Sequence, residues 1–282
     1  MRITLKDFIK KEALHLSSIY DEKEAQSIIK MLLSFLIGDI NNTDLMLGKE
    51  LPGDFDFNNW LTFVNRLKQK EPIQYITEQA WFGENLFFVK QGVLIPREET
   101  YELVQLILLE NKEVVEVLDL CTGSGCIAIS LAKSNQNYKV SAVDISEIAL
   151  EIANVNNKKL LTNVNFIQDN VLDFKQNYTI YDVIVSNPPY VTNAEKNRMH
   201  ANVLEHEPHL ALFVEDEEPL IFYKAIAVFA TTHLKKGGKL YFEINEQFGE
   251  ETKTLLQSLG FEEVSIIKDI HQKDRFVTAI WN

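Results

Sequence analysis

The chain has 282 residues, of which 46% are hydrophobic and 24% are charged, and its formal net charge is −13 at pH 7. This composition is that of an ordinary globular protein, long enough for one large domain with a smaller one attached. The acidic balance argues against a broad phosphate-binding surface, because non-specific affinity for nucleic acid comes from Lys and Arg. No stretch approaches the roughly 20 apolar residues that span a bilayer.

The N-terminal segment MRITLKDFIKKEALHL is amphipathic and lacks the apolar core and cleavage site of a signal peptide, so we expect a cytoplasmic protein. Two cysteines, Cys121 and Cys126, lie five positions apart in a predicted strand–helix junction. A disulfide is not expected in a reducing compartment, and two thiols alone make a poor zinc site. We therefore predict two buried, inert thiols.

Residues 1–72 are predicted to form a small helical bundle. Segments such as TLKDFIKKEALHL and DEKEAQSIIKMLLSFLIG keep a helical spacing of apolar residues, and the second ends at Gly38. A third segment places Trp60, Phe63 and Leu67 on one face, with Pro72 beyond its end. None of the polar residues in this region converges into a chemical pattern.

The remainder of the chain changes in character. Residues 73–95 are rich in aromatic and β-branched residues, with Gly83 and Gly92 as breaks, and predict a hairpin-like linker. Residues 96–282 alternate strands with helices, which favours an α/β domain with a mostly parallel sheet covered on both faces. The last two predicted strands, in FEEVSIIKDI and RFVTAIW, have only a short connection and should pair antiparallel.

The segment VLDLCTGSGCIAIS predicts a strand, a glycine-containing loop and a helix. Gly123 and Gly125 would let the backbone approach a ligand closely, and the helix N-terminus offers free amide donors. The loop lacks the third glycine of the dinucleotide fingerprint and the Lys of a phosphate-binding loop. A tight turn without a ligand remains the alternative for this loop taken alone.

The next two predicted strands also end in polar residues. Asp144 ends one strand about 20 residues after the glycine loop, where a carboxylate accepts hydrogen bonds from ribose hydroxyls; a helix-capping role is compatible with this. Asp169 and Asn170 end the following strand and suit an adenine edge. Glycines, an acid and an amide at three strand ends predict an adenosine ligand without a pyrophosphate clamp, which favours S-adenosylmethionine (SAM) over NAD.

The segment VSNPPYV follows a fourth buried strand, which must stop near Ser186 because proline donates no ladder hydrogen bond. Asn187 is thus held at a strand tip by a stiff turn. Its side-chain oxygen and a proline carbonyl can accept both hydrogens of a planar amino group, which turns the nitrogen lone pair towards a methyl donor. Tyr190 would pack on the planar group. A plain Pro-Pro turn is the structural alternative.

Taken together, NPPY, LDLCTGSG and AVDIS resemble class I SAM-dependent methyltransferases that act on planar nitrogens. PIQYI, WFG, VLIPREET and HEPHLAL further resemble the PrmC/HemK family, from about residue 72 to the end of the chain. The resemblance implies a Rossmann-like seven-stranded methyltransferase domain behind an N-terminal helical domain. It also implies methylation of the glutamine side-chain amide in the GGQ motif of peptide chain release factors, with the helical domain contacting the factor.

Carried over residue by residue, the resemblance implies two groups of site residues. Those that contact SAM would be Cys121, Thr122, Gly123, Ser124, Gly125, Asp144, Asn170 and Asn187. Those that hold the glutamine amide would be Asn187, Pro188, Pro189 and Tyr190. Of these, Asn187 and Pro188 would be the catalytic residues, because they orient the amide nitrogen that receives the methyl group. The sequence departs from the family pattern at Glu78, Cys121 and Gln272, where Gly is common, and at Glu98, where Pro is common.

Other functions stay open at this point. An adenine-amino DNA methyltransferase would share NPPY, but it needs a basic recognition surface. A glutamine methyltransferase for a ribosomal protein differs only in its partner, and a non-catalytic relic would bind no SAM. His200, His206 and His209 match no metal-ligand spacing, so no metal is expected. Nothing in the sequence reports the oligomeric state, and the working expectation is a monomer.

Overall fold

The structure is a computed structural model that describes residues 3–113 and 115–282. The chain divides into two compact units, which are described separately. The first comprises residues 1–79 and 200–206, and the second comprises residues 80–199 and 207–282. No helix among the described residues is long and apolar enough to cross a membrane.

The described residues of the first unit form helices joined by turns, with one isolated bridge between Thr4 and Glu50, as the sequence predicted in kind for residues 1–72. Its helices are α1 (Leu5–Leu14), α2 (Glu22–Ile37), α3 (Asn42–Met46), α4 (Phe57–Lys68), α5 (Ile73–Thr77) and α9 (Ala201–His206). Polar N-caps start the longer ones: Asp21 accepts from the amides of Lys23 and Glu24. The core is built on Trp60, whose Nε1 donates to buried Glu12 at 2.9 Å, so the indole and the acid satisfy one another.

The predicted linker is divided between the units. Its first part forms α5, which ends at Glu78 in a left-handed conformation with φ of 54°. The unit boundary then falls between Gln79 and Ala80, inside strand β1 (Gln79–Phe82). β1 pairs with β2 (Asn85–Phe88) as the hairpin that the sequence predicted.

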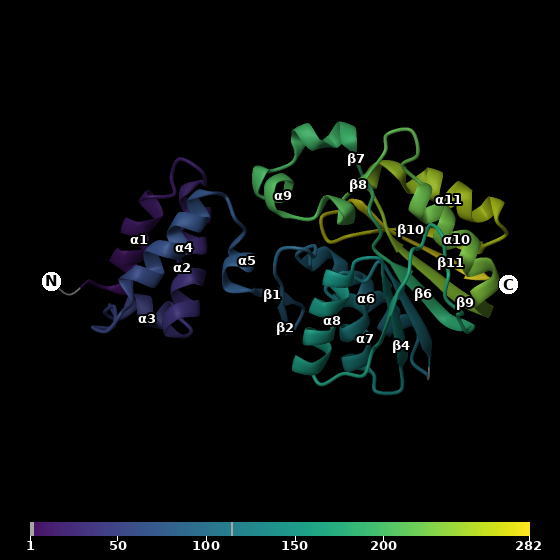
Figure 1. Ribbon diagram of the computed structural model, residues 1–282, viewed down its shortest axis with the longest axis horizontal. Coiled ribbons are helices and arrows are strands. Elements are labelled where there is room, and N and C mark those ends of the chain that lie inside the picture. The colour runs from purple at the N-terminus through teal and green to yellow at the C-terminus, as the bar shows by residue number, and fades with distance from the viewer. Residues whose placement is uncertain (1–2, 114) are drawn as a thin grey trace. The chain divides into compact units, whose positions relative to one another are not determined.

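The second unit is centred on a seven-stranded sheet with the order β10-β11-β9-β6-β3-β4-β5 (Figure 1). Its strands are β3 (Glu116–Leu120), β4 (Lys139–Asp144), β5 (Asn165–Gln168), β6 (Tyr181–Ser186), β9 (Leu234–Glu243), β10 (Glu262–Lys268) and β11 (Asp274–Trp281). Five neighbouring strands, β9 to β5 in that order, run parallel. β11 pairs antiparallel with both β9 and β10, which confirms the prediction for the chain's last two strands.

Helices cover both faces of this sheet. They are α6 (Glu98–Glu110), α7 (Cys126–Ser134), α8 (Glu147–Lys159), α10 (Ile221–His233) and α11 (Gly249–Ser258). Helix α7 contacts both α6 and α8, and α10 contacts α11, so the helices form two layers. The short elements are β7 (Val191–Thr192), β8 (Phe213–Val214), η1 (Asn193–Arg198), η2 (His209–Ala211) and η3 (Glu246–Phe248).

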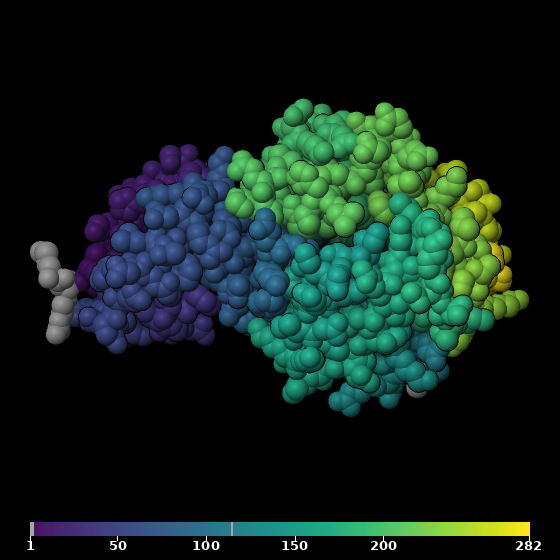
Figure 2. Space-filling model, viewed as in Figure 1, coloured from purple at the N-terminus to yellow at the C-terminus, as the bar shows by residue number. Residues whose placement is uncertain are grey.

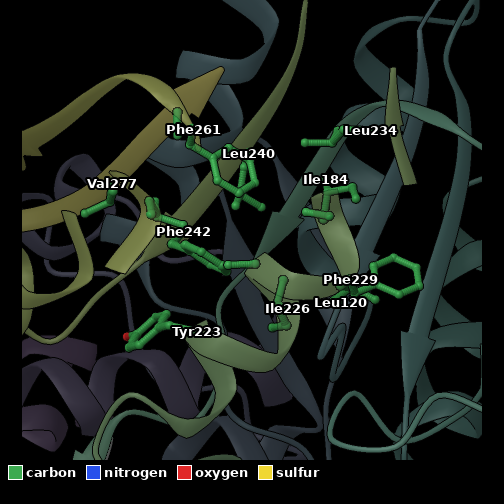
Figure 3. Packing of buried hydrophobic residues seen from close by; sticks show 14 of the residues in the cluster. Leu120, Ile184, Tyr223, Ile226, Phe229, Leu234, Leu240, Phe242, Phe261 and Val277 are labelled. Atoms are coloured by element: carbon green, nitrogen blue, oxygen red, sulfur yellow. The ribbon is translucent and has the colours of Figure 1, made fainter. Parts of the chain in front are cut away.

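The period of two along β3 explains the two layers. Leu118 and Leu120 point into the cluster formed with α10 and α11, where Phe242 and Tyr223 also lie (Figure 3). The alternate residue Asp119 points to the opposite face, towards α7. Because both faces of the central parallel strands are covered, β3 and β6 are buried along most of their length. Polar residues also stand at several carboxyl ends, including Asp144 of β4 and Ser186 of β6.

Candidate active site

A cavity of about 370 Å³ lies at the carboxyl ends of the parallel strands. Its walls come from the loops that follow β3, β4, β5 and β6, together with residues 92–97 and 208–211. Figure 2 shows, in space-filling form, the teal and green segments of this unit that border it. The volume falls within the range of roughly 300–1,000 Å³ typical of small-molecule sites, and the edge of the sheet is where such ligands bind in α/β folds.

Most of the site residues predicted from the sequence come together here. Those that line the cavity are Cys121, Thr122, Gly123, Ser124, Asp144, Asp169, Asn170, Asn187 and Pro189. Gly125, Pro188 and Tyr190 belong to the same loops but are not among the lining residues. Apolar side chains from the same loops, including Ile145, Val171 and Leu172, complete the wall and offer a surface for a flat ring.

The loop after β3 owes its shape to left-handed backbone. Cys121, Gly123 and Gly125 have φ of 62°, 55° and 80°, a region that glycine enters without steric cost. At Gly125 a Cβ atom would lie 2.8 Å from Ile129 Cδ1 and 3.2 Å from Ala153 Cβ, so a side chain there would also have to displace Ile129 and Ala153. At Gly123 nothing lies within 4 Å of a Cβ atom, and only the backbone conformation argues for glycine.

Asp144 connects this loop to the next strand end. One carboxylate oxygen, Oδ2, accepts from the Gly123 amide at 2.8 Å, and the other, Oδ1, accepts from the Ser146 amide at 2.9 Å. Ser146 in turn caps α8. Burial raises the pKa of Asp144, while the Ser146 and Gly123 amides oppose that rise. The carboxylate thus braces the loop and also faces the cavity. The helix cap is Ser146, and the ribose role of Asp144 stays a prediction.

A second acid, Asp119, lies beneath the same loop and was not singled out from the sequence. It is fully buried on β3; its Oδ2 accepts from Thr122 Oγ1 at 2.6 Å and from the Ala128 amide at 3.3 Å. Its Oδ1 has no hydrogen-bond partner among the described residues. Burial raises the pKa of Asp119 to about 7. The sequence signal that could have identified Asp119 is the presence of an acid inside the apolar run VLDL.

The loop after β5 is fixed by Asp169. This carboxylate accepts from the amides of Asn170, Lys175 and Gln176 and from the Tyr178 hydroxyl at 2.8 Å. Burial alone would raise the pKa of Asp169, but these hydrogen bonds outweigh it and lower the pKa. The side-chain oxygen of Asn170 accepts from the Leu172 amide at 2.9 Å, which orients Asn170 at the cavity wall.

Asn187 follows β6 directly. The preceding residue, Ser186, is buried, and its hydroxyl donates to the Leu120 carbonyl at 2.7 Å, which ties the end of β6 to the end of β3. Asn187 Nδ2 donates to Thr100 Oγ1 at 3.3 Å. Tyr190 points its hydroxyl to Glu243 Oε1 at 3.1 Å. Neither Thr100 nor Glu243 was singled out from the sequence, although Glu243, the last residue of β9, is like Asp119 an acid next to apolar strand residues.

The two cysteines are free thiols that line the cavity: Cys121 lies in the loop after β3, and Cys126 is the first residue of α7. Burial raises the pKa of Cys126 to about 12 and raises that of Cys121 as well. A thiol in this state is a poor nucleophile, because the thiolate is the reactive form. The raised pKa values agree with the prediction of inert thiols, but the prediction of full burial is wrong, because both side chains are only partly buried where they face the cavity.

The hairpin β1–β2 is joined to the glycine loop by Asn156. This α8 residue is fully buried; its Oδ1 accepts from the Phe88 amide at 2.6 Å, and its Nδ2 donates to the carbonyls of Phe88 and Ser124 at 2.9 and 3.0 Å. One side chain thus satisfies backbone groups from two segments that are 36 residues apart (Phe88 to Ser124).

The opposite wall contains an ion pair between buried Glu207 and partly exposed Arg97. Glu207 is 4% exposed; its Oε1 accepts from Arg97 at 2.6 Å, and its Oε2 accepts from the Ile95 amide at 3.1 Å. The pair joins the IPREET segment to the HEPHLAL segment, both of which line the cavity. Charge-assisted hydrogen bonds of this kind are stronger than neutral ones, so the wall is held firmly.

The three histidines do not assemble into a ligand set. His206 Nε2 lies 2.9 Å from the Gln69 carbonyl, and His209 packs edge-on against Phe213 with ring centroids 5.1 Å apart. Among residues 3–113 and 115–282 no group of three His, Cys, Asp or Glu side chains could hold a metal ion.

The fold is that of class I SAM-dependent methyltransferases. Among solved structures, a methyltransferase from Pyrococcus furiosus matches with a TM-score of 0.53 at 19% identity, covering 80% of this chain and 98% of that one. The T. thermophilus 16S rRNA N2 G1207 methyltransferase, solved with AdoMet and guanosine, matches with a TM-score of 0.52 at 15% identity, covering 72% of this chain and 50% of that one. At such identities these matches report the fold alone.

Sequence relatives identify the family. Residues 102–211 match the methyltransferase small domain. The release factor glutamine methyltransferase of Flavobacterium psychrophilum is 44% identical, over 93% of this chain and 94% of its own length. That of Bacteroides thetaiotaomicron is 46% identical, over 94% of this chain and 95% of its own length. The chain belongs to the family of release factor glutamine methyltransferases, as its resemblance to PrmC/HemK proteins had indicated.

Proposed function

We propose that this protein transfers the methyl group of SAM to the side-chain amide nitrogen of a glutamine, the one in the GGQ motif of a peptide chain release factor. The observation that carries the proposal is the position of Asn187. It lines the same cavity as Asp144 and Gly123, so an acceptor for a planar amino group lies in one chamber with a predicted adenosine site. The sequence relatives support the choice of a release factor as the substrate.

The residues present fit SAM. The loop Cys121–Gly125 would hold the amino-acid end of SAM near the N-terminus of α7, where backbone amides are available. Asp144 would accept from the ribose hydroxyls, and Asn170 with the apolar wall would hold the adenine. Asp119 Oδ1 is a buried acceptor without a partner beneath the loop, which suits a site that receives a cationic amino-acid group.

When bound, SAM supplies an electrophilic methyl group on sulfur. The chain's part is to present the acceptor nitrogen. Asn187 Oδ1 and the Pro188 carbonyl would accept the two amide hydrogens, so that the lone pair turns towards the methyl group as the nitrogen becomes tetrahedral. A nitrogen–carbon bond forms, the sulfur keeps the electron pair of the broken bond, and the nitrogen releases one proton. The sulfur product is S-adenosylhomocysteine, and the chemistry requires no metal.

We further propose that the helical unit binds the release factor. It exposes several large apolar side chains that its own core does not use, which is typical of a docking surface. The most exposed are Met46 at 85%, Leu47 at 81% and Leu14 at 70%, followed by Leu61 at 55% and Phe57 at 53%. Met46, Leu47, Leu14 and Leu61 are not members of the buried cluster around Trp60, so they can be changed with little effect on the core. Phe57 packs edge-on against Phe8 and Phe55 and is therefore not a suitable position for such a change.

The test uses methyl-labelled SAM with three acceptors: a purified release factor, a ribosomal protein mixture and duplex DNA. We expect label on the release factor, lost when its GGQ glutamine is replaced by glutamate. Label only on ribosomal protein or on DNA would overturn the proposed substrate. A chain that binds no SAM in calorimetry would overturn the proposed reaction.

A further inference from the structure

Behind the Asn187–Tyr190 turn lies a buried carboxylate that touches both ends of the turn through hydroxyl groups. Glu243 is the last residue of β9, next to β6 in the sheet, and is 2% exposed. Its Oε2 accepts from Thr100 Oγ1 at 2.6 Å, and its Oε1 accepts from the Tyr190 hydroxyl at 3.1 Å. Thr100 is also 2% exposed and lies in the first turn of α6.

The direction of these hydrogen bonds fixes the orientation of Asn187. A threonine hydroxyl has one proton, and Thr100 gives it to Glu243. The side of Thr100 Oγ1 that faces Asn187 therefore carries lone pairs, and only the amino end of the Asn187 amide can meet it. That contact is present, with Nδ2 3.3 Å from Oγ1.

The alternative orientation is unfavourable at two places. If the Asn187 amide rotated by half a turn, its oxygen would face the lone pairs of Thr100. Its amino group would then point where an acceptor is needed for the substrate amide, and two donors would meet. An amide group has nearly the same shape in both orientations, so shape alone does not choose between them.

We propose that Thr100 and Glu243 are positioning residues that set the amide orientation of Asn187, so that its oxygen and not its amino group faces the acceptor. This inference deepens the function proposed above and depends on it for the identity of the acceptor. Glu243 directs Thr100, Thr100 directs Asn187, and the second oxygen of Glu243 holds Tyr190 at the other end of the same turn.

The cost of burying Glu243 supports this role. A carboxylate in an apolar interior is unfavourable unless it is fully hydrogen-bonded, and a well-packed apolar residue would commonly be at least as stable there. Burial raises the pKa of Glu243, against the hydrogen bond from Thr100 and the charge of Arg275. A group that costs stability but accepts from two hydroxyls is suited to orienting them.

The experiment compares four variants under saturating SAM, with release factor concentration varied. Thr100→Val removes the hydroxyl but keeps the shape, and Glu243→Gln replaces one acceptor oxygen by a donor. We expect both to lower kcat by about tenfold, the effect of one lost oriented hydrogen bond, with KM and the Kd for SAM nearly unchanged. Thr100→Ser keeps the hydroxyl and should restore kcat. Tyr223→Phe is the matched control, because it deletes another buried hydroxyl that donates to the Glu243 carbonyl at 3.2 Å, and it should leave kcat unchanged.

Two further measurements separate positioning from a merely structural role. In an Asn187→Ala background, Thr100→Val should cause no additional loss, because there is no amide left to orient. The side-chain amide resonances of Asn187, assigned by their absence in Asn187→Ala, should lose their protection from hydrogen exchange in Thr100→Val. This second readout needs no acceptor, so it decides the inference even if the parent protein labels no release factor, a result that would overturn only the proposed function.

The inference is overturned if Thr100→Val retains the parent kcat, or if its loss is equally large with and without Asn187. It is also overturned if Tyr223→Phe lowers kcat as much as Thr100→Val, since general loosening of the core would then explain both. If Thr100→Val does not fold, as judged by its circular dichroism melting curve, the same outcomes are read from Glu243→Gln.

Discussion

The two walls of the cavity are built by different means. On the side of β3 and β4, backbone forms the wall: left-handed residues shape the loop, and the Gly123 and Ser146 amides bind Asp144. On the side of β6, a side-chain relay through Thr100 to Glu243 orients Asn187. The first wall should therefore respond mainly to changes that restrict the backbone, and the second to the loss of single hydroxyl or carboxylate groups.

The largest effect is expected at the side-chain wall. Asn187→Ala removes the acceptor that orients the substrate nitrogen, and we expect methyl transfer to fall by about 10²–10³-fold, as for other oriented polar groups at a reacting centre. Affinity for SAM should hardly change. The measurement is kcat with labelled SAM alongside the Kd from calorimetry, and a variant that matches the parent in kcat would show that the wall is wrongly assigned.

A pH dependence tests the acid beneath the backbone wall. Asp119 has a pKa near 7 in the fold, against an ordinary value of 3.8. Between these values the folded chain keeps a proton that the unfolded chain releases, so this group's contribution to stability falls as the pH rises from about 4 to about 7. The fall amounts to on the order of 2 to 4 kcal/mol. In Asp119→Asn it should vanish, which chemical denaturation of both proteins across this range measures; a constant difference between them would contradict the assignment.

Asp144→Ala should act on binding first. The change removes the brace of the Gly123 loop and the predicted ribose acceptor together, so we expect the Kd for SAM to rise by about ten- to a hundredfold, the effect of one or two lost hydrogen bonds to a charged group. Once SAM is saturating, kcat should recover in large part. An unchanged Kd would remove Asp144 from the ribose site.

Two glycines in the backbone wall form a matched pair. Gly125→Ala combines a left-handed φ with a Cβ contact of 2.8 Å to Ile129, and should destabilise the fold by about 2 to 3 kcal/mol. Gly123→Ala has the backbone cost without the contact and should lose only about 1 kcal/mol. Urea denaturation gives both values. An equal loss of unfolding free energy in the two variants would mean that the close packing at Gly125 adds nothing to the cost of the substitution.

The smallest effect is expected outside both walls. Gln272 is exposed and has φ of 64°, at a position where the family commonly has glycine. Gln272→Gly should stabilise the fold by up to about 1 kcal/mol by removing left-handed strain, while Gln272→Ala should not. Thermal unfolding distinguishes the two variants. Methyl transfer is measured alongside and should be the same in both, because Gln272 lies outside both walls of the cavity.

The sequence predicted those features that depend on neighbouring residues. The alternation of strands and helices, the antiparallel end of the sheet and the polar ends of successive strands all follow from short-range patterns. The same holds for Asn187, whose position is fixed by the two prolines after it. Glu78, Cys121 and Gln272, where the resemblance to the family implied glycine, all adopt left-handed φ, so that resemblance predicted the backbone conformation at these positions.

What the sequence did not predict depends on contacts between distant positions. Thr100 and Glu243 are 143 residues apart, and nothing near either residue indicates that they meet. Helix α9 is grouped with the first unit although it lies more than a hundred residues after the rest of it. Asp119 and Glu243 were visible as acids in apolar strands, but their partners are set by the order in which the strands assemble.

The contacts of Asn156 couple two parts of the second unit energetically. Its side chain is hydrogen-bonded both to Phe88 in the hairpin and to Ser124 in the glycine loop, so the position of one segment biases the position of the other. A ligand that orders the loop should then favour the closed hairpin, and by reciprocity a partner that binds the hairpin should favour the ordered loop by the same free energy. A methyl donor and a protein acceptor would in this way influence one another's affinity through one amide group.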